Sequence, residues 1–138
     1  MAKVLVIDDE ANVRTLTEML LQHRGHEVLL ADNGPKGLEL YRREHPDVIL
    51  LDLKMPEMDG VEVLTQIRRV DLKQPVIIVT GDSRPATERE VRALGVSGFI
   101  VKGSALDSLG ETLNLLIKAL RPLPPDGRRK TIEGQPMG

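Results

Sequence analysis

Polar side chains of three chemical kinds follow the ends of four short apolar runs in this sequence. Asp8 and Asp9 come directly after V-L-V-I, and Asp52 comes directly after V-I-L-L. Thr80 follows a third run, and Lys102 follows a fourth. Carboxylates that lie close together repel one another, and a hard divalent cation relieves that repulsion through oxygen ligands. In phosphoryl transfer, a cation can bind one equatorial oxygen, a hydroxyl can donate a hydrogen bond to a second, and an ammonium can pair with the third. A carboxylate can then act as the nucleophile. The residue types therefore indicate phosphoryl-transfer chemistry with Asp52 as the nucleophile.

These side chains can act together only if the fold brings the ends of the apolar runs to one place. The runs are rich in β-branched residues and do not alternate with polar positions, which is typical of strands in a parallel sheet that is covered on both faces. A stretch with helical spacing or helix-start signals follows each run, so the chain repeats strand then helix five times. The expected strands are 4–7, 28–31, 48–51, 76–79 and 99–101, and the expected helices are 11–24, 35–45, 61–70, 84–94 and 104–120.

Right-handed crossovers between parallel strands leave few arrangements for such a chain. We predict an α/β fold with a doubly wound five-stranded parallel sheet, order 2-1-3-4-5, which is the flavodoxin-like (βα)5 arrangement. Ligands of open parallel sheets bind beyond the carboxyl ends of the strands, at the switch point, which here lies between the first and third strands. Both of these strands end in carboxylates, so the site is expected there.

Composition excludes several other kinds of site. The chain has 138 residues, enough for one domain with a normal core. It has no Cys, which excludes a disulfide scaffold, a thiolate zinc site and cysteine catalysis. With one Phe, one Tyr and no Trp, it lacks the aromatic side chains of a base-stacking nucleic-acid platform. The formal net charge of −2 gives no broad attraction to nucleic acid or to anionic membranes.

The apolar runs and the Pro and Gly content indicate the expected domain organisation. No apolar run approaches the roughly 20 residues that span a bilayer, and the first run is interrupted too early for a signal peptide. We therefore expect a cytoplasmic domain at 1–120 that binds neither membranes nor nucleic acid directly. Residues 121–138 are rich in Pro and Gly and are expected to form a flexible tail or a truncated linker.

The sequence resembles the receiver domains of two-component response regulators over about residues 2–120. The motifs that carry the resemblance are Asp8-Asp9, D-V-I-L-L-D ending at Asp52, M-P-E-M-D-G at 55–60, V-I-I-V-T-G around Thr80, and F-I-V-K ending at Lys102. The combination of these motifs is specific to the receiver family, whereas each motif alone is weak evidence for it. The resemblance implies a phosphorelay signalling protein rather than an enzyme with a separate substrate.

The resemblance also implies roles for the residues at the predicted site. Asp52 would accept a phosphoryl group from a phosphohistidine on a sensor histidine kinase or a phosphotransfer protein. Mg²⁺, or Mn²⁺, would be bound by Asp9, by Asp52 and by the backbone carbonyl of Lys54, with Asp8 acting mainly through a bound water.

The remaining implied roles concern the response to phosphorylation. Thr80 and Lys102 would contact the phosphoryl group, and Phe99 would rotate inward when Thr80 moves. The surface made by the fourth helix, fifth strand and fifth helix would be the output face, and a homodimer through this face is a further expectation.

Two positions depart from the pattern of many receivers, and two further positions bear on the lifetime of the phosphorylated state. Gly103 follows Lys102 where many receivers have Pro, and Gly leaves the backbone there less restricted. The switch residue Phe99 has no hydroxyl, so it can signal by burial but not by a hydrogen bond. At two positions that tune the lifetime of the phosphorylated state in this family, the chain has Lys54 and Asp82. Their opposite charges predict a pair across the mouth of the site and slow self-dephosphorylation.

Three other functions are alternatives to the receiver. A haloacid-dehalogenase-like phosphotransferase shares the aspartyl nucleophile, but its D-x-D signature follows the first strand and it needs a cap over its substrate. A flavodoxin-like FMN carrier needs a hydroxyl- and Gly-rich phosphate loop where this chain has Asp-Asp-Glu. A pseudo-receiver that acts only as an interaction module would not need the complete motif set that is present here.

Overall fold

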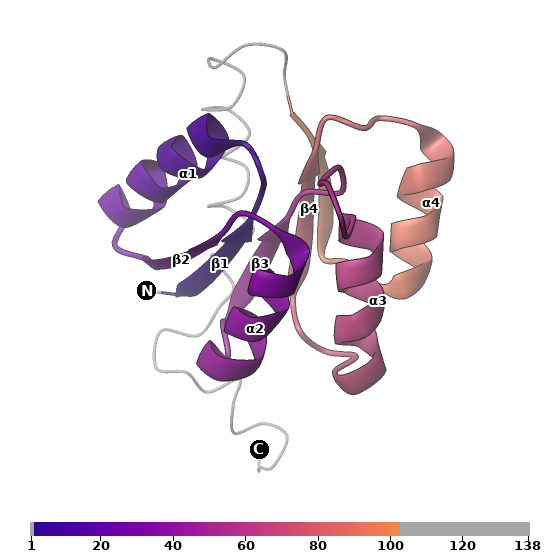
Figure 1. The fold of residues 1–138 in the computed structure, drawn as a ribbon, viewed down its shortest axis with the longest axis horizontal. Helices are drawn as coiled ribbons and strands as arrows, with labels where there is room; N and C mark the ends of the chain where they lie inside the picture. The colour runs from indigo at the N-terminus through magenta and orange to yellow at the C-terminus, as the bar shows by residue number, and fades with distance from the viewer. Residues whose placement is uncertain (1, 103–138) are drawn as a thin grey trace.

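The computed structural model describes residues 2–102, and in this range five strands alternate with four helices. Figure 1 shows the strands in the middle of the molecule with the helices outside them. The elements are β1 (Lys3–Ile7), α1 (Ala11–His23), β2 (Glu27–Ala31), α2 (Gly34–Glu44), β3 (Val48–Leu51), α3 (Gly60–Val70), β4 (Val76–Thr80), α4 (Pro85–Leu94) and β5 (Gly98–Val101).

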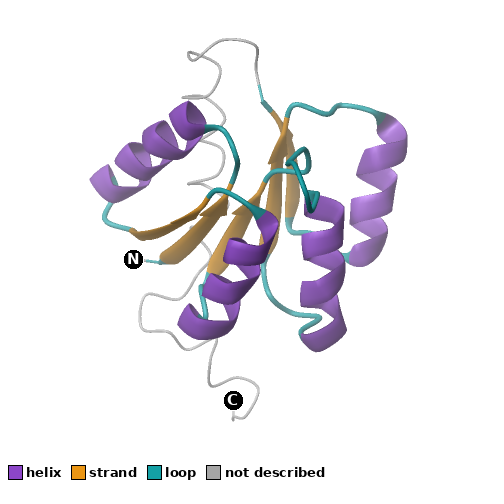
Figure 2. Ribbon diagram, viewed as in Figure 1, coloured by secondary structure: helices purple, strands orange, loops and turns teal. Residues whose placement is uncertain are grey.

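All strands are parallel, and the sheet order is β2-β1-β3-β4-β5. This order confirms the predicted 2-1-3-4-5 arrangement and places the switch point between β1 and β3. Figure 2 shows the strands side by side with helices around them. In the register of these two central strands, Ile7 lies beside Leu51. The residues that follow them, Asp8 and Asp52, therefore leave the sheet side by side.

The strands contribute side chains to two separate hydrophobic cores, because successive side chains in a strand point to opposite faces of the sheet. On one face, Ile7, Leu51 and Ile78 belong to a cluster that also takes in buried side chains of α2, α3 and α4. On the other face, Val6, Leu50 and Val79 pack with a cluster that includes Leu21 of α1. Both faces are covered, which explains why the strand sequences are apolar throughout.

Two of the four described helices have a side-chain cap at their first turn, and two do not. Asn33 caps α2 and Asp59 caps α3, each with a side-chain oxygen that accepts a backbone N–H three residues ahead. Glu10 at α1 and Arg84 at α4 occupy the same position without making a side-chain cap. All four described helices begin at the edge of the sheet where the strands end, because each follows a strand of a parallel sheet.

At the opposite edge, the side chain of Arg68 joins α3 to the loops around it. Its guanidinium donates hydrogen bonds to the carbonyls of Leu94 and Gly95 at the end of α4, with distances from 2.7 to 3.1 Å. It also donates to the carbonyls of Asp71 and Gln74, at 2.9 and 2.8 Å. One side chain thus satisfies carbonyls in two loops, and it fixes α3 relative to α4.

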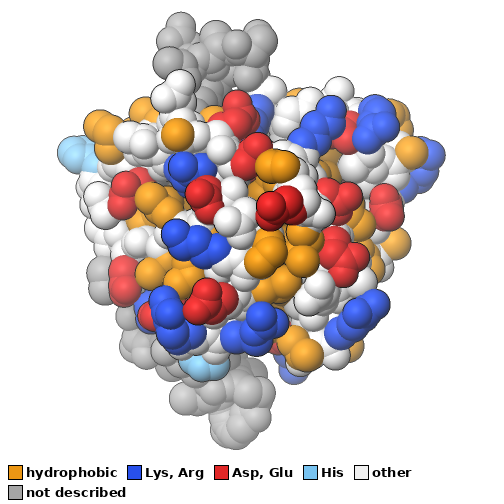
Figure 3. All heavy atoms as spheres, in the orientation of Figure 1, with side chains coloured by type: hydrophobic (Ala, Val, Ile, Leu, Met, Phe, Trp, Pro, Cys, Tyr) orange, Lys and Arg blue, Asp and Glu red, His pale blue; other side chains and the backbone are white. Residues whose placement is uncertain are grey.

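The predicted elements agree with the observed ones to within one residue at each end for the nine elements described. The predicted fifth helix at 104–120 and the tail at 121–138 lie outside the described residues. None of the four described helices combines the length and apolar character that a membrane span requires. On the face shown in Figure 3, acidic and basic side chains are interspersed, with apolar side chains between them.

Candidate functional site

The site is built where β1 and β3 end, and backbone hydrogen bonds set its geometry. The N–H of Asp52 donates to the carbonyl of Ile7 at 2.9 Å, and the N–H of Asp8 donates to the carbonyl of Ala31 at 3.0 Å. These bonds continue the parallel pairing one residue beyond the strands. Asp8 and Asp52 are each only 3% exposed, so two carboxylates stand side by side at the bottom of the site.

Lys102 reaches the same place from the end of β5. Its backbone N–H donates to the carbonyl of Thr80 at 2.7 Å, which continues the pairing of β5 with β4. Its ammonium lies 2.8 Å from Asp8 Oδ2, 2.8 Å from Glu10 Oε1 and 3.3 Å from Asp52 Oδ2. The predicted convergence of Asp8, Asp52 and Lys102 is therefore present in the structure.

Burial and pairing shift the protonation equilibria at this site in opposite ways. Burial raises the pKa of Asp8 to about 6, although the hydrogen bonds from Lys102 and from the Glu10 N–H oppose the shift. Burial alone would lower the pKa of Lys102, but its hydrogen bonds to Asp8 and Glu10 outweigh that effect and raise its pKa. The ammonium thus stays charged, while Asp8 is held ionised at neutral pH by a narrow margin.

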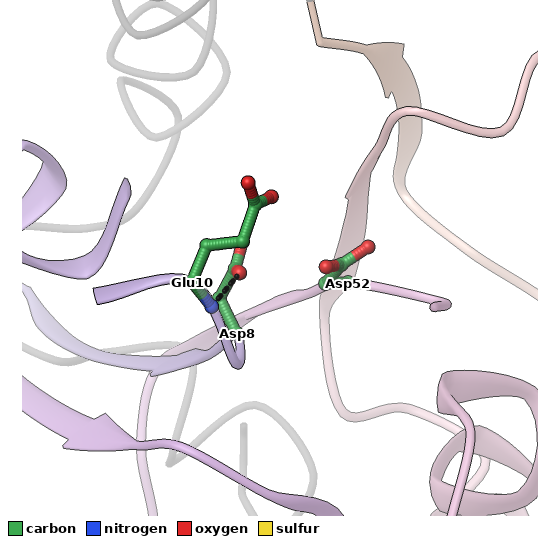
Figure 4. Close-up of side chains that lie close together, drawn as sticks. All are labelled: Asp8, Glu10 and Asp52. Atoms are coloured by element: carbon green, nitrogen blue, oxygen red, sulfur yellow. Dashed lines mark hydrogen bonds between the residues drawn. The ribbon is translucent and has the colours of Figure 1, made fainter. Parts of the chain in front are cut away.

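Three carboxylates form a group that can hold a cation. One ligand oxygen from each of Asp8, Glu10 and Asp52 lies within 4.8 Å of the others. Figure 4 shows these three side chains converging from the two strand ends. Lys102 offsets only one of the three negative charges, and the oxygen donors are of the kind that Mg²⁺ and Mn²⁺ prefer. The residues therefore fit a divalent cation.

Asp9 is not in that group, although the resemblance names it as a cation ligand. In the part of the chain that the structure describes, Glu10 takes the third place in the cluster instead. The reason is local: the Glu10 N–H donates to Asp8 Oδ1 at 2.9 Å, the bond drawn dashed in Figure 4, and this turn directs Glu10 back over Asp8. The sequence placed Glu10 at the end of the first strand with Asp8 and Asp9 but gave it no role at the site, because its only signal was its place in that run of three carboxylates.

Thr80 ends β4 with its side chain fully buried. Its hydroxyl oxygen accepts a hydrogen bond from the backbone N–H of Asp82 at 3.2 Å. Because β4 pairs with both β3 and β5, Thr80 stands in the same row of strand ends as Asp52 and Lys102. The structure therefore brings Thr80 to the predicted edge of the sheet.

Asp82 has a different partner from the predicted one. Its carboxylate accepts from Arg84 Nε at 2.9 Å and Arg84 Nη2 at 2.7 Å, and from Thr87 Oγ1 at 3.2 Å. These bonds from Arg84 hold the pKa of Asp82 well below its usual range. The predicted pair with Lys54 is wrong for this structure, because the guanidinium two residues along the chain already binds both carboxylate oxygens.

Lys54 still lies beside Asp52. Its backbone N–H donates to Asp52 Oδ1 at 3.2 Å. Lys54, Asp82 and Arg84 all line an open groove of about 490 Å³ that runs between the loop after β3 and the start of α4. The groove therefore opens beside Lys54, whose N–H contacts Asp52.

Phe99 is partly buried and packs against the core cluster on the α2–α3–α4 side of the sheet. In the register of β5 with β4 it lies beside Ile78, two residues before Thr80. The Phe99 side chain is thus partly buried, on the strand that Lys102 directly follows.

The loop after β3 approaches Asp52 closely, and Gly60 makes this approach feasible. The Gly60 N–H donates to the carbonyl of Leu53 at 2.9 Å. A Cβ atom at Gly60 would collide with the backbone carbonyl oxygen of Asp52 and would lie 2.7 Å from the Cα of Leu53. Within this loop Glu57 has a backbone φ of 70°, which residues other than Gly rarely adopt.

A doubly wound parallel sheet with buried carboxylates, a hydroxyl and a paired ammonium at its switch point defines a class of α/β protein with an acidic, cation-accepting site. Comparison with known proteins places the chain within this class. The family model of the response regulator receiver domain matches residues 4–114. The chain belongs to this family, the receiver domains of two-component signalling.

Individual relatives agree with the family assignment. The chain is 35% identical to the regulatory protein AtoC of Escherichia coli, over 84% of this chain and 24% of AtoC. It is 31% identical to the chemotaxis protein CheY of Bacillus subtilis, over 81% of this chain and 94% of CheY. The chain thus spans about a quarter of one relative and nearly all of the other.

A solved structure shows the same fold. The response regulator TrrA of Thermotoga maritima, determined in complex with Mg²⁺ and beryllium fluoride, is 32% identical and superposes with a TM-score of 0.71. The match covers 84% of this chain and 99% of that structure.

Proposed function

We propose that this chain is a phosphorylation-driven switch in which Asp52 accepts a phosphoryl group from the phosphohistidine of a cytoplasmic sensor histidine kinase or phosphotransfer protein. A carboxylate oxygen of Asp52 attacks phosphorus, the bond from phosphorus to the imidazole nitrogen breaks, and the imidazole takes up a proton. The observation that carries the proposal is the convergence of Asp8, Asp52 and Lys102 at the switch point of the sheet.

A divalent cation, Mg²⁺ or Mn²⁺, would neutralise charge on the transferring phosphoryl oxygens when bound. Asp8 and Asp52 are the residues best placed to hold it, because both are buried and belong to the three-carboxylate group. Asp9 and the carbonyl of Lys54 remain predicted ligands on the strength of the family resemblance.

Thr80 and Lys102 are proposed to bind the phosphoryl oxygens after transfer. Thr80 ends β4, which neighbours β3, and Lys102 follows β5 and already contacts Asp52. We propose that movement of Thr80 is passed to Phe99 on β5 and so to the surface of α4 and β5, which belong to the expected output face. The predicted fifth helix of that face, at 104–120, lies outside the described residues. A homodimer through this face remains part of the proposal.

Slow self-dephosphorylation remains a prediction, but on changed grounds. Lys54 and Asp82 line the same groove beside Asp52, although they do not pair. The Arg84 side chain stands there as well, and the three residues together would restrict the path of a hydrolytic water. Decay of the phosphorylated protein, followed by intact mass, tests this; decay as fast as in chemotaxis receivers would contradict it.

The central experiment is phosphorylation by a small phosphodonor in the presence of Mg²⁺, read by intact mass. A single phosphoryl adduct is expected, and it should be absent in Asp52→Asn and after chelation of the metal. Asp32→Asn is the matched control, because Asp32 follows the neighbouring strand β2, is exposed and lies outside the three-carboxylate group.

The other outcomes distinguish the alternative functions. Turnover of free phosphate esters without an adduct would favour a phosphotransferase of the haloacid-dehalogenase kind. Binding of the kinase without any adduct would favour a pseudo-receiver.

A further inference from the structure

The ammonium of Lys102 has all its hydrogen-bonding capacity engaged. An ammonium carries three N–H donors and no acceptor. Three carboxylates, those of Asp8, Glu10 and Asp52, lie within 3.3 Å of Nζ. A new oxygen partner for Lys102 must therefore replace one of these three.

The three carboxylates differ in the free energy that would be lost if each gave up its contact with Lys102. The side chains of Asp8 and Asp52 are 5% and 4% exposed, whereas that of Glu10 is 59% exposed. A buried carboxylate that loses its partner is left with unsatisfied charge, whereas an exposed one regains water. Glu10 is thus the partner that Lys102 can give up most easily.

The position of Glu10 in the fold supports a dedicated role. Glu10 is the N-cap residue of α1, yet its side chain does not cap the helix. The Glu10 carboxylate contacts Lys102 instead, across 92 positions of sequence. The side chain thus forgoes a local hydrogen bond in favour of a long-range ion pair at the site.

We propose that Glu10 is a positioning residue, the exchangeable partner that holds Lys102 in its resting place and releases it to the phosphoryl oxygen. This inference rests on the proposed function, because it concerns the phosphorylated state of Asp52. The contact between Lys102 and Glu10 then opposes phosphorylation, and its loss favours the phosphorylated arrangement.

The test measures binding of beryllium fluoride, a phosphoryl mimic, at saturating Mg²⁺. Because the chain has no Trp, backbone amide shifts in NMR serve as the signal. Glu10→Gln is expected to bind beryllium fluoride about two- to fivefold more tightly than the wild type, which is the scale of an exposed ion pair. Saturating Mg²⁺ separates this effect from any change in cation affinity.

Two further variants separate the contact from charge alone. Glu57→Gln removes the same charge from an exposed side chain in the loop after β3 that does not contact Lys102, and it should bind like the wild type. Glu10→Asp keeps the charge but shortens the side chain by one methylene, so it should behave like Glu10→Gln. The ammonium resonance of Lys102 should shift in Glu10→Gln and stay unchanged in Glu57→Gln.

The possible outcomes distinguish the proposed role of Glu10 from the proposed function of the chain. If wild type binds beryllium fluoride and Glu10→Gln binds it equally or more weakly, the role of Glu10 is wrong and the proposed function stands. Equal tightening in Glu57→Gln, or wild-type behaviour of Glu10→Asp, would show a general charge effect and would also overturn the inference. If wild type neither binds beryllium fluoride nor accepts a phosphoryl group, the proposed function itself fails.

Discussion

Arg84 binds both carboxylate oxygens of Asp82, with Nε 2.9 Å from Oδ1 and Nη2 2.7 Å from Oδ2. The backbone N–H of the same Asp82 donates to the hydroxyl of Thr80. A continuous series of hydrogen bonds therefore runs from the end of β4 to the first turn of α4, where Thr87 also donates to Asp82. These bonds link the Thr80 hydroxyl to the start of α4 through Asp82.

Replacing Arg84 with Ala should raise the pKa of Asp82 toward the ordinary aspartate range, because hydrogen bonds from Arg84 are the main cause of its depression. The ¹³C resonance of the Asp82 carboxyl, followed through an acid titration, measures this directly. Arg92→Ala is the matched control: Arg92 lies on the same helix and pairs with Glu88 at 2.7 Å, away from Asp82. An unchanged Asp82 titration in Arg84→Ala would contradict the assignment.

Stability between pH 4 and 6 should depend on Asp8. Burial raises its pKa from 3.8 to about 6, so in this window the folded state binds more protons than the unfolded chain. The free energy of unfolding due to this group therefore falls as the pH rises from 4 to 6, by about 1–2 kcal/mol. Urea unfolding of wild type and Asp8→Asn across this range tests it, since the difference between them should change with pH by that amount and then level off above pH 6.

The central pair of the site was predictable because its position follows from topology. Asp8 and Asp52 directly follow the two strands that flank the switch point, and parallel pairing of those strands places them together. The same reasoning located Lys102 and Thr80. Each of these positions depends only on strand order and register, which the apolar runs define.

The position of the Glu10 side chain depends on a local hydrogen bond, which the topology does not specify. In a run of three carboxylates, a hydrogen bond from the Glu10 N–H to Asp8 decides which side chain turns toward the site. The partner of Asp82 was mispredicted for a similar reason. Arg84 is nearer in sequence than Lys54, and its planar guanidinium can bind both carboxylate oxygens, which an ammonium cannot do with the same geometry. Short-range side-chain geometry of this kind is set by the turn and not by the periodicity of the chain.

Arg68 should contribute strongly to the stability of the α3–α4 side of the fold. Removal of its guanidinium leaves carbonyls of Leu94, Gly95 and Gln74 without this donor. We expect Arg68→Ala to lower the free energy of unfolding by about 2–3 kcal/mol. Arg68→Lys should recover little of the loss, because an ammonium cannot match the forked geometry. Chemical denaturation measures the effect, with the exposed neighbour Arg69→Ala as the control; equal losses in the two alanine variants would contradict the assignment.

Gly60 should be intolerant of any side chain because its neighbours are backbone atoms of the site. A Cβ there would collide with the carbonyl oxygen of Asp52 and would lie 2.7 Å from the Cα of Leu53. Since neither atom can rotate away, we expect Gly60→Ala to destabilise the protein by about 2 kcal/mol or more and to shift the amide resonances of Asp52 and Leu53. Gly81→Ala is the matched control, because a Cβ at Gly81 meets nothing within 4 Å and should leave stability nearly unchanged. If Gly60→Ala unfolded at the same denaturant concentration as Gly81→Ala, the loop after β3 would have to yield easily, and the close approach would not be what holds Asp52 in place.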